Sequence, residues 1–189
     1  MTKVDERKMK FSEITGNELR WVQTAKLESE LVTPDQQVVA RLVWKNSWGS
    51  MATGESALGN WTFKRAGFLR PKITIRKAET DESLGAVTMD FRGSGVLETS
   101  EGESYNFKMS RRNLTVLDSN QNQILTITPE DSDRKRIQAA VQVERKGDRP
   151  DKLAFLITLG WYMILLITQY DGSDSGYVAM ITAVLVASA

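Results

Sequence analysis

Cysteine and histidine are both absent from this chain of 189 residues. Without cysteine, the chain can form no disulfide, no thiolate nucleophile and no cysteine-ligated metal site. Without histidine, it lacks the usual general base near neutral pH and the commonest metal ligand. Any catalysis would have to use Asp, Glu, Lys, Tyr or Ser. We therefore expect a protein that is not an enzyme, with no catalytic residues, no cofactor and no metal.

The chain also lacks an excess of charge of one sign, because its formal net charge is only +1. No nucleic-acid partner is expected, since binding to phosphate backbones depends largely on concentrated positive charge. The N-terminal residues carry charge but no apolar run, so they do not resemble a signal peptide. With no disulfides, the expected location is cytoplasmic, with membrane association as an open alternative.

Residues 35–147 show the period-two alternation of half-buried β-strands. Apolar and polar side chains alternate at 38–44, 60–64, 72–76, 86–91, 105–109 and 136–144. Turn-forming residues separate these runs, for example Gly93-Ser94-Gly95 and Glu101-Gly102. Short strands at this spacing predict a mainly β fold, either a meander or a barrel. For residues 4–31 the pattern does not decide between helix and strand.

A run of fifteen uncharged residues, Leu153 to Ile167, predicts a helix that is apolar on every face. Such a helix must be enclosed by protein or by lipid. A membrane span needs about 20 apolar residues, so a central helix buried in the domain is favoured. Residues 177–189 form a second apolar stretch, which keeps a membrane hairpin open as an alternative. Trp44, Trp48, Trp61 and Trp161 are expected in the core.

Several short motifs occur in an order that resembles a bacterial branch of the tubby C-terminal-like superfamily. This superfamily includes the plant LURP-one-related proteins and the phospholipid scramblases. The matching segments span roughly residues 25–170, and no single one is diagnostic: Gly59–Phe68, Arg70–Arg76, Gly93–Glu98, Gly102–Phe107, Leu117-Asp118 and Leu159–Leu166.

The resemblance implies a closed antiparallel barrel of about twelve strands around a hydrophobic C-terminal helix. The expected organisation is an N-terminal extension (1–24), a tubby-like barrel (25–170) with its central helix at 150–169, and an apolar C-terminal tail (171–189). The tail departs from the family, which usually ends near the central helix.

A basic run without acids suggests a binding surface, because tubby proteins present basic residues to phosphoinositides. The candidate patch for anionic lipid is formed by Lys64, Arg65, Arg70, Lys72, Arg76 and Lys77. A plain alternative is a solvated strand face. The expected function is thus a non-enzymatic binding or scaffold domain whose partner is an anionic phospholipid or a protein. The alternative is a membrane-anchored protein with a cytosolic β-domain and C-terminal hydrophobic spans.

Overall fold

The computed structural model describes residues 18–47, 49–67, 71–111, 113–130, 137–144 and 150–171, with the side chains of 150 and 169–171 left undescribed. It contains twelve strands and one helix, α1 (Pro150–Asp171). The strands are β1 (Leu19–Ala25), β2 (Glu28–Val32), β3 (Val38–Trp44), β4 (Met51–Ser56), β5 (Gly59–Ala66), β6 (Lys72–Lys77), β7 (Ser83–Met89), β8 (Gly95–Thr99), β9 (Ser104–Ser110), β10 (Asn113–Leu117), β11 (Gln123–Glu130) and β12 (Gln138–Val143).

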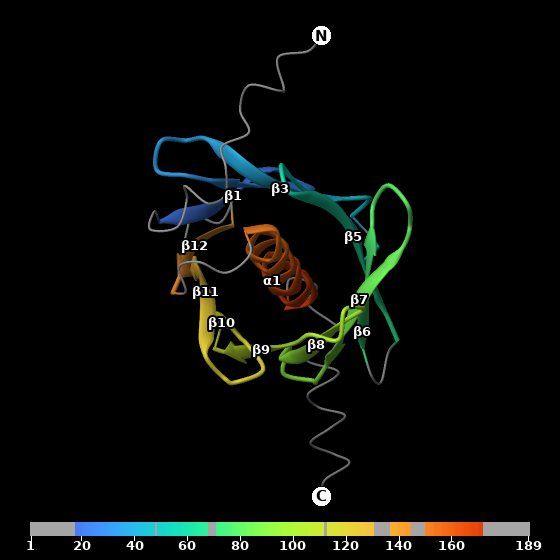
Figure 1. Ribbon diagram of the computed structural model, residues 1–189. Coiled ribbons are helices and arrows are strands. Elements are labelled where there is room, and N and C mark those ends of the chain that lie inside the picture. Colours follow the sequence, from blue (N-terminus) through green and yellow to red (C-terminus); the bar gives the residue numbers. More distant parts are fainter. Residues whose placement is uncertain are drawn as a thin grey trace, which may run out of the picture.

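The strands form one closed barrel in which each strand pairs antiparallel with its neighbour in sequence (Figure 1). Closure is completed by β1 and β12, where Trp21 lies opposite Ala139. A closed sheet leaves no exposed strand edge that could pair with another chain. The predicted architecture, a closed antiparallel barrel of about twelve strands around a hydrophobic helix, is confirmed.

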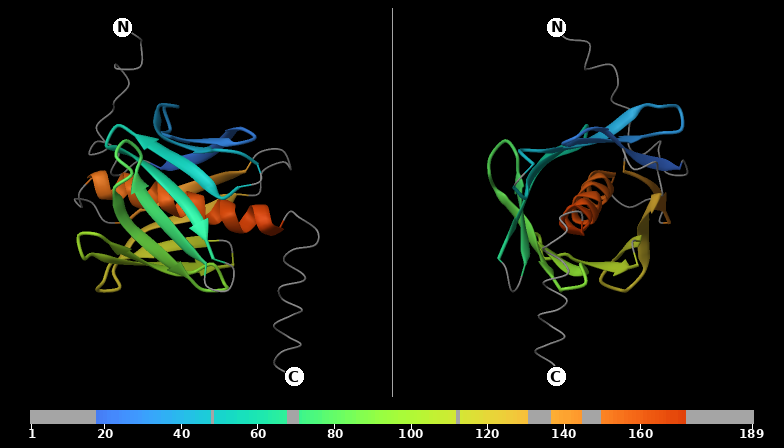
Figure 2. Two further views of the ribbon diagram at one scale, coloured as in Figure 1. Left: turned by 90° about the vertical axis from the view of Figure 1, so that its right-hand side faces the viewer. Right: turned by 180° about the vertical axis from the view of Figure 1, so that it is seen from behind.

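The helix α1 runs through the barrel (Figure 2). Its buried side chains, together with those of the wall, form the core. Aromatic side chains from the wall stack on it: the Trp21 and Trp161 ring centroids lie 5.7 Å apart, and those of Trp44 and Tyr162 lie 5.1 Å apart. The Tyr162 hydroxyl donates to the carbonyl oxygen of Ser50 and accepts from the backbone N–H of Arg65. These contacts fix the helix to β1, β3 and β5.

The same helix is long and apolar enough to cross a membrane, over Asp151–Thr168. In this fold, however, 72% of that segment is buried inside the protein. An all-round apolar helix therefore has its partner in the barrel wall, and its low amphipathicity follows from being surrounded on all sides.

Small residues allow the helix to approach the wall closely at two places. A Cβ at Gly160 would lie 2.8 Å from Cδ1 of Ile127 and 3.0 Å from Cδ2 of Leu114. In β4, a Cβ at Gly54 would lie 2.6 Å from Cγ2 of Thr158 in α1. The shortest distance at each position is below van der Waals contact between carbons, so a side chain at either position would force its neighbours to shift.

Three details differ from the sequence-based expectation. The strand β1 lies largely within the stretch 1–24 that we expected to precede the barrel, and its signal is short because only Leu19 and Trp21 are buried before the strand turns polar. The helix extends to Asp171 rather than 169. The strand expected at 86–91 ends at Met89, so Phe91 lies in a turn, 69% exposed.

The tryptophan prediction is confirmed for Trp44, Trp61 and Trp161, which are all buried. Trp48, Arg70 and the tail after Asp171 lie outside the described residues.

The barrel has two ends, which are defined by the helix. The α1-start rim comprises the connections after β2, β4, β6, β8 and β10, because Lys152 in the first turn of α1 reaches Glu101 between β8 and β9. The α1-end rim comprises the connections after β1, β3, β5, β7, β9 and β11, because a side chain at Gly93, between β7 and β8, would collide with Ile167.

Candidate functional site

The described residues of the predicted basic patch, which are all but Arg70, do not lie on one face of the sheet. The chain places its residues on two paired strands, β5 and β6, whose side chains alternate between the outer wall and the interior. Lys64, Lys72 and Arg76 are exposed on the outer wall, each adjacent in sequence to a buried apolar residue. Arg65 and Lys77 follow the other alternation and lie at opposite ends of the strand pair.

Two further facts weaken the patch on the outer wall. The Arg76 guanidinium forms an ion pair with Asp81, with 2.8 Å between Nη1 and Oδ2. Threonines separate the cations, since Thr74 pairs directly with Lys64 across the two strands. Because a paired cation contributes little net field, the unpaired cations of the predicted patch on this part of the wall are mainly Lys64 and Lys72.

Four of the six connections on the α1-end rim carry a basic residue among their described residues. Each of these four connections has one exposed cation: Lys26, Lys45, Arg92 and Arg111. The one acid among their described residues is Asp90. The Asp90 carboxylate accepts hydrogen bonds from the backbone N–H groups of Arg92 (2.8 Å) and Ser94 (2.9 Å). The predicted residue Lys72 begins β6 beside this rim.

An exposed aromatic side chain lies on the same rim. Phe91 is 69% exposed, the largest exposed fraction of any large hydrophobic residue in the described part of the chain. The guanidinium carbon of Arg92 lies 5.3 Å from the Phe91 ring centroid, which is within cation–π range. The rim thus presents an apolar ring next to positive charge.

The opposite rim carries the other sign of charge. The described strand connections of the α1-start rim contain no basic residue. They contain seven acids: Asp35, Glu79, Asp81, Glu82, Glu101, Glu103 and Asp118. A hydrogen bond from the Asn60 side chain, together with backbone bonding and nearby Lys77, lowers the pKa of Glu79. Among the described strand connections, charge is therefore separated along the barrel axis, with acids at the α1-start rim and mainly bases at the α1-end rim.

A cleft of about 150 Å³ opens on the α1-start rim. Its apolar walls come from β5, β7, β9, α1 and the β4–β5 turn: Leu58, Trp61, Leu84, Tyr105 and Phe155. The rings of Trp61 and Phe155 are in tilted contact, with centroids 5.6 Å apart. Leu58 is 38% exposed at the opening.

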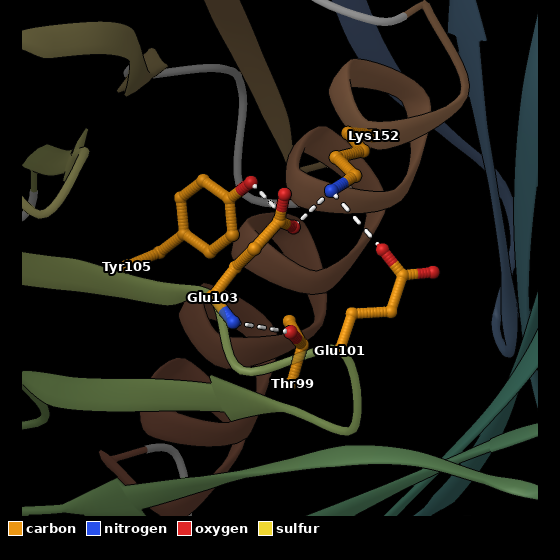
Figure 3. A network of polar contacts seen from close by, with 5 residues as sticks. All are labelled: Thr99, Glu101, Glu103, Tyr105 and Lys152. Carbon is orange, nitrogen blue, oxygen red and sulfur yellow. Dashed lines mark hydrogen bonds and ion pairs between the residues drawn. The ribbon is translucent and has the colours of Figure 1, made fainter.

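A polar network forms one side of the cleft (Figure 3). Lys152 forms ion pairs with Glu101, at 3.3 Å, and with Glu103. The Tyr105 hydroxyl donates to Glu103 over 3.2 Å, and the Glu103 N–H donates to the Thr99 hydroxyl over 3.0 Å. The side chain of Lys152 is only 17% exposed, so the network ties the first turn of α1 to the β8–β9 turn.

Sequence reasoning missed both rims and the cleft. Counting which connections share a rim requires every strand, and β1, β2, β4, β8, β10 and β11 were not among the six predicted runs. The exposure of Phe91 has a local signal, because Asp90 and Gly93-Ser94-Gly95 are turn-forming residues that end the strand before it. Among the described residues, no group of three or more Asp or Glu side chains is placed to hold a metal ion.

No protein-family model matches this sequence, and no curated protein matches it significantly. Among solved structures, the chain resembles the X-ray structure of a protein from Arabidopsis thaliana, with a TM-score of 0.51 and 11% sequence identity. The match covers 76% of this chain and 90% of the plant protein. At this identity the likeness concerns the fold alone.

Proposed function

We propose that this chain is a non-enzymatic binding module of the tubby-like type that docks its α1-end rim onto anionic membranes. The observation that carries the proposal is the coincidence of exposed Phe91 with the basic connections of one rim, while the other rim is acidic. The order of sequence motifs and the barrel with its central helix support the tubby-like assignment.

The physical argument is electrostatic orientation. Each Lys or Arg near an anionic bilayer contributes about 1 kcal/mol, so the four cations of the rim, opposed by Asp90, would contribute roughly 3 kcal/mol. Transfer of the exposed Phe91 ring into the interface would add about 2 kcal/mol. The sum corresponds to roughly sub-millimolar affinity, which is reversible and sensitive to salt.

The α1-start rim supports the same orientation, because its carboxylates are repelled by an anionic surface. A protein with mixed charges on both rims would have no preferred pose. The separation along the barrel axis therefore favours one pose, in which the axis stands along the membrane normal and the acidic rim faces the solvent.

The barrel interior is occupied by α1 and is not open to a lipid (Figure 1). The side chains of α1 for which an exposure is given at 153–154, 156–157 and 159–166 are each less than 5% exposed. This observation also directs the proposal to the rims. A fatty-acyl chain inside the barrel would require α1 to leave, at the cost of its buried apolar contacts.

Membrane anchoring is the second candidate, and a specific observation favours it. The helix ends at Asp171 on the basic rim, and the apolar stretch 177–189 follows it in sequence. An anchor that continues from this rim would hold the same face against the bilayer. The helix α1 itself would not serve as the anchor, because it lies inside the barrel.

Co-sedimentation with vesicles tests the proposal. We expect the protein to bind phosphatidylserine-containing vesicles and not pure phosphatidylcholine vesicles. Replacing the four rim cations with Ser, or Phe91→Ser alone, should reduce binding. The matched control replaces four cations elsewhere on the wall with Ser: Arg41, Lys64, Arg76 and Lys108.

The outcomes separate the candidates. Loss of binding in both charge variants to the same degree would point to net charge rather than to the rim, and would refute the proposed face. Release by high salt indicates electrostatic docking, whereas binding that resists salt and yields only to detergent indicates the anchor.

A further inference from the structure

The cleft at the α1-start rim combines apolar walls with an excess of negative charge. Three of its lining residues are acids, Glu101, Glu103 and Asp151, and one is a base, Lys152. The lining residues therefore carry a formal charge of −2 (three acids minus one base), and the cleft opens on the rim whose described connections are acidic. This charge opposes the anion preference that the nearby N-terminus of α1 would have alone.

Its size limits the occupant. A cavity of about 150 Å³ accommodates a group the size of a benzene ring, far smaller than a drug-sized ligand. The walls suit such a group, because Trp61 and Phe155 supply aromatic faces and Leu58 and Leu84 supply aliphatic surface. An aromatic ring that enters the cleft would cover Leu58, which is an exposed large hydrophobic residue.

We propose that this cleft is a binding site for a small organic amine, a protonated ammonium group carried on one aromatic ring or a short alkyl chain. The apolar body lies against Trp61, Leu84 and Phe155, and the ammonium is held by the carboxylates at the rim. This site lies at the opposite end of the barrel from the basic rim, and the inference does not depend on membrane docking.

Lys152 shows how the site receives a cation. Its ammonium group already contacts both Glu101 and Glu103, and Tyr105 and Thr99 hold Glu103 in place through its carboxylate and its backbone N–H (Figure 3). The carboxylates are thus pre-positioned around an ammonium. A ligand ammonium competes with the one on Lys152 for the same negative charge, so removal of Lys152 should strengthen amine binding.

An amide NMR titration with phenethylammonium tests the inference, with 2-phenylethanol as the uncharged probe of the same shape. We expect saturable shifts at 99–103 and 151–155 with the amine, and at least about threefold weaker binding of the alcohol, as one partly exposed ion pair implies. Asp151→Asn should weaken amine binding about two- to fivefold. Asp35→Asn, an equal charge change on the same rim outside the cleft, should leave it unchanged.

The decisive variant is Lys152→Gln. If the site binds cations, this variant binds phenethylammonium more tightly than the unmodified protein. If Lys152 only braces the helix, amine binding falls or stays the same, and the inference is wrong. Equal binding of the two probes, or shifts confined to other parts of the barrel, would overturn it as well. A thermal unfolding curve for each variant shows that the barrel is intact.

Discussion

The substitution Leu159→Asp tests whether the helix belongs to the protein core. Leu159 has no exposed surface and lies in the middle of α1 inside the barrel. Truncation of a buried leucine costs about 2–5 kcal/mol, and an unpaired carboxylate in an apolar interior adds several kcal/mol more. Domains of this size are stable by only about 5–15 kcal/mol. The substitution should therefore abolish cooperative folding.

Urea unfolding followed by tryptophan fluorescence provides the measurement, because Trp21 and Trp161 stack at the barrel–helix contact. The milder Leu159→Ala should remain folded and lose about 2–5 kcal/mol. The control is Val96→Asp on the outer wall, where the side chain is 40% exposed and the change should cost less than about 1 kcal/mol. A Leu159→Asp protein that unfolds at the urea concentration of the unmodified chain would refute the reasoning.

Three further predictions concern local contacts. Gly160→Ala should cost about 1–3 kcal/mol in urea unfolding, because its Cβ would press on Ile127; an unchanged midpoint would show that the wall yields freely. Tyr162→Phe should cost about 1–3 kcal/mol in the same assay, since it removes the hydroxyl that bonds the Ser50 carbonyl and the Arg65 N–H, and a neutral result would contradict that bonding. Asn60→Ala should raise the pKa of the Glu79 carboxyl towards its usual value in an NMR pH titration, and an unchanged pKa would mean that the hydrogen bond is not its main cause.

The barrel was predictable where inward residues are large and the alternation is long. Strands β3, β5 and β6 have such a pattern, with pairs such as Phe63 and Ile75 facing inward. Strand β4 was not recognised because its buried residues are Ala52 and Gly54. These residues are small because Thr158 of α1 lies close to the strand at Gly54. The close packing of the helix therefore leaves β4 without the large buried apolar residues by which a strand is recognised in sequence.

The functional surface was harder to predict because charge depends on topology rather than on sequence proximity. The run from Lys64 to Lys77 appears concentrated in sequence, yet strand alternation divides it between the wall and the two ends. Conversely, Lys26 and Arg111 are far apart in sequence but share a rim, because alternate connections of an up-and-down barrel lie at the same end. The cleft depends on the helix returning to the β8–β9 turn, and only the folded chain shows this contact.

The absence of native cysteine allows a direct test of where the helix lies. The pair Gly54→Cys and Thr158→Cys joins β4 to α1 at a point where a Cβ on residue 54 would lie 2.6 Å from Cγ2 of Thr158, so the two cysteine side chains would meet at this contact. A disulfide needs the two Cβ atoms about 3.5–4.5 Å apart, which places it within reach of a contact this close. After refolding under oxidising conditions, we predict a nearly complete intramolecular bond by mass spectrometry. The control pair, Glu98→Cys on the outer wall with Thr158→Cys, should remain unbonded. If the first pair stays reduced, or both pairs form equally, the helix does not lie inside the barrel.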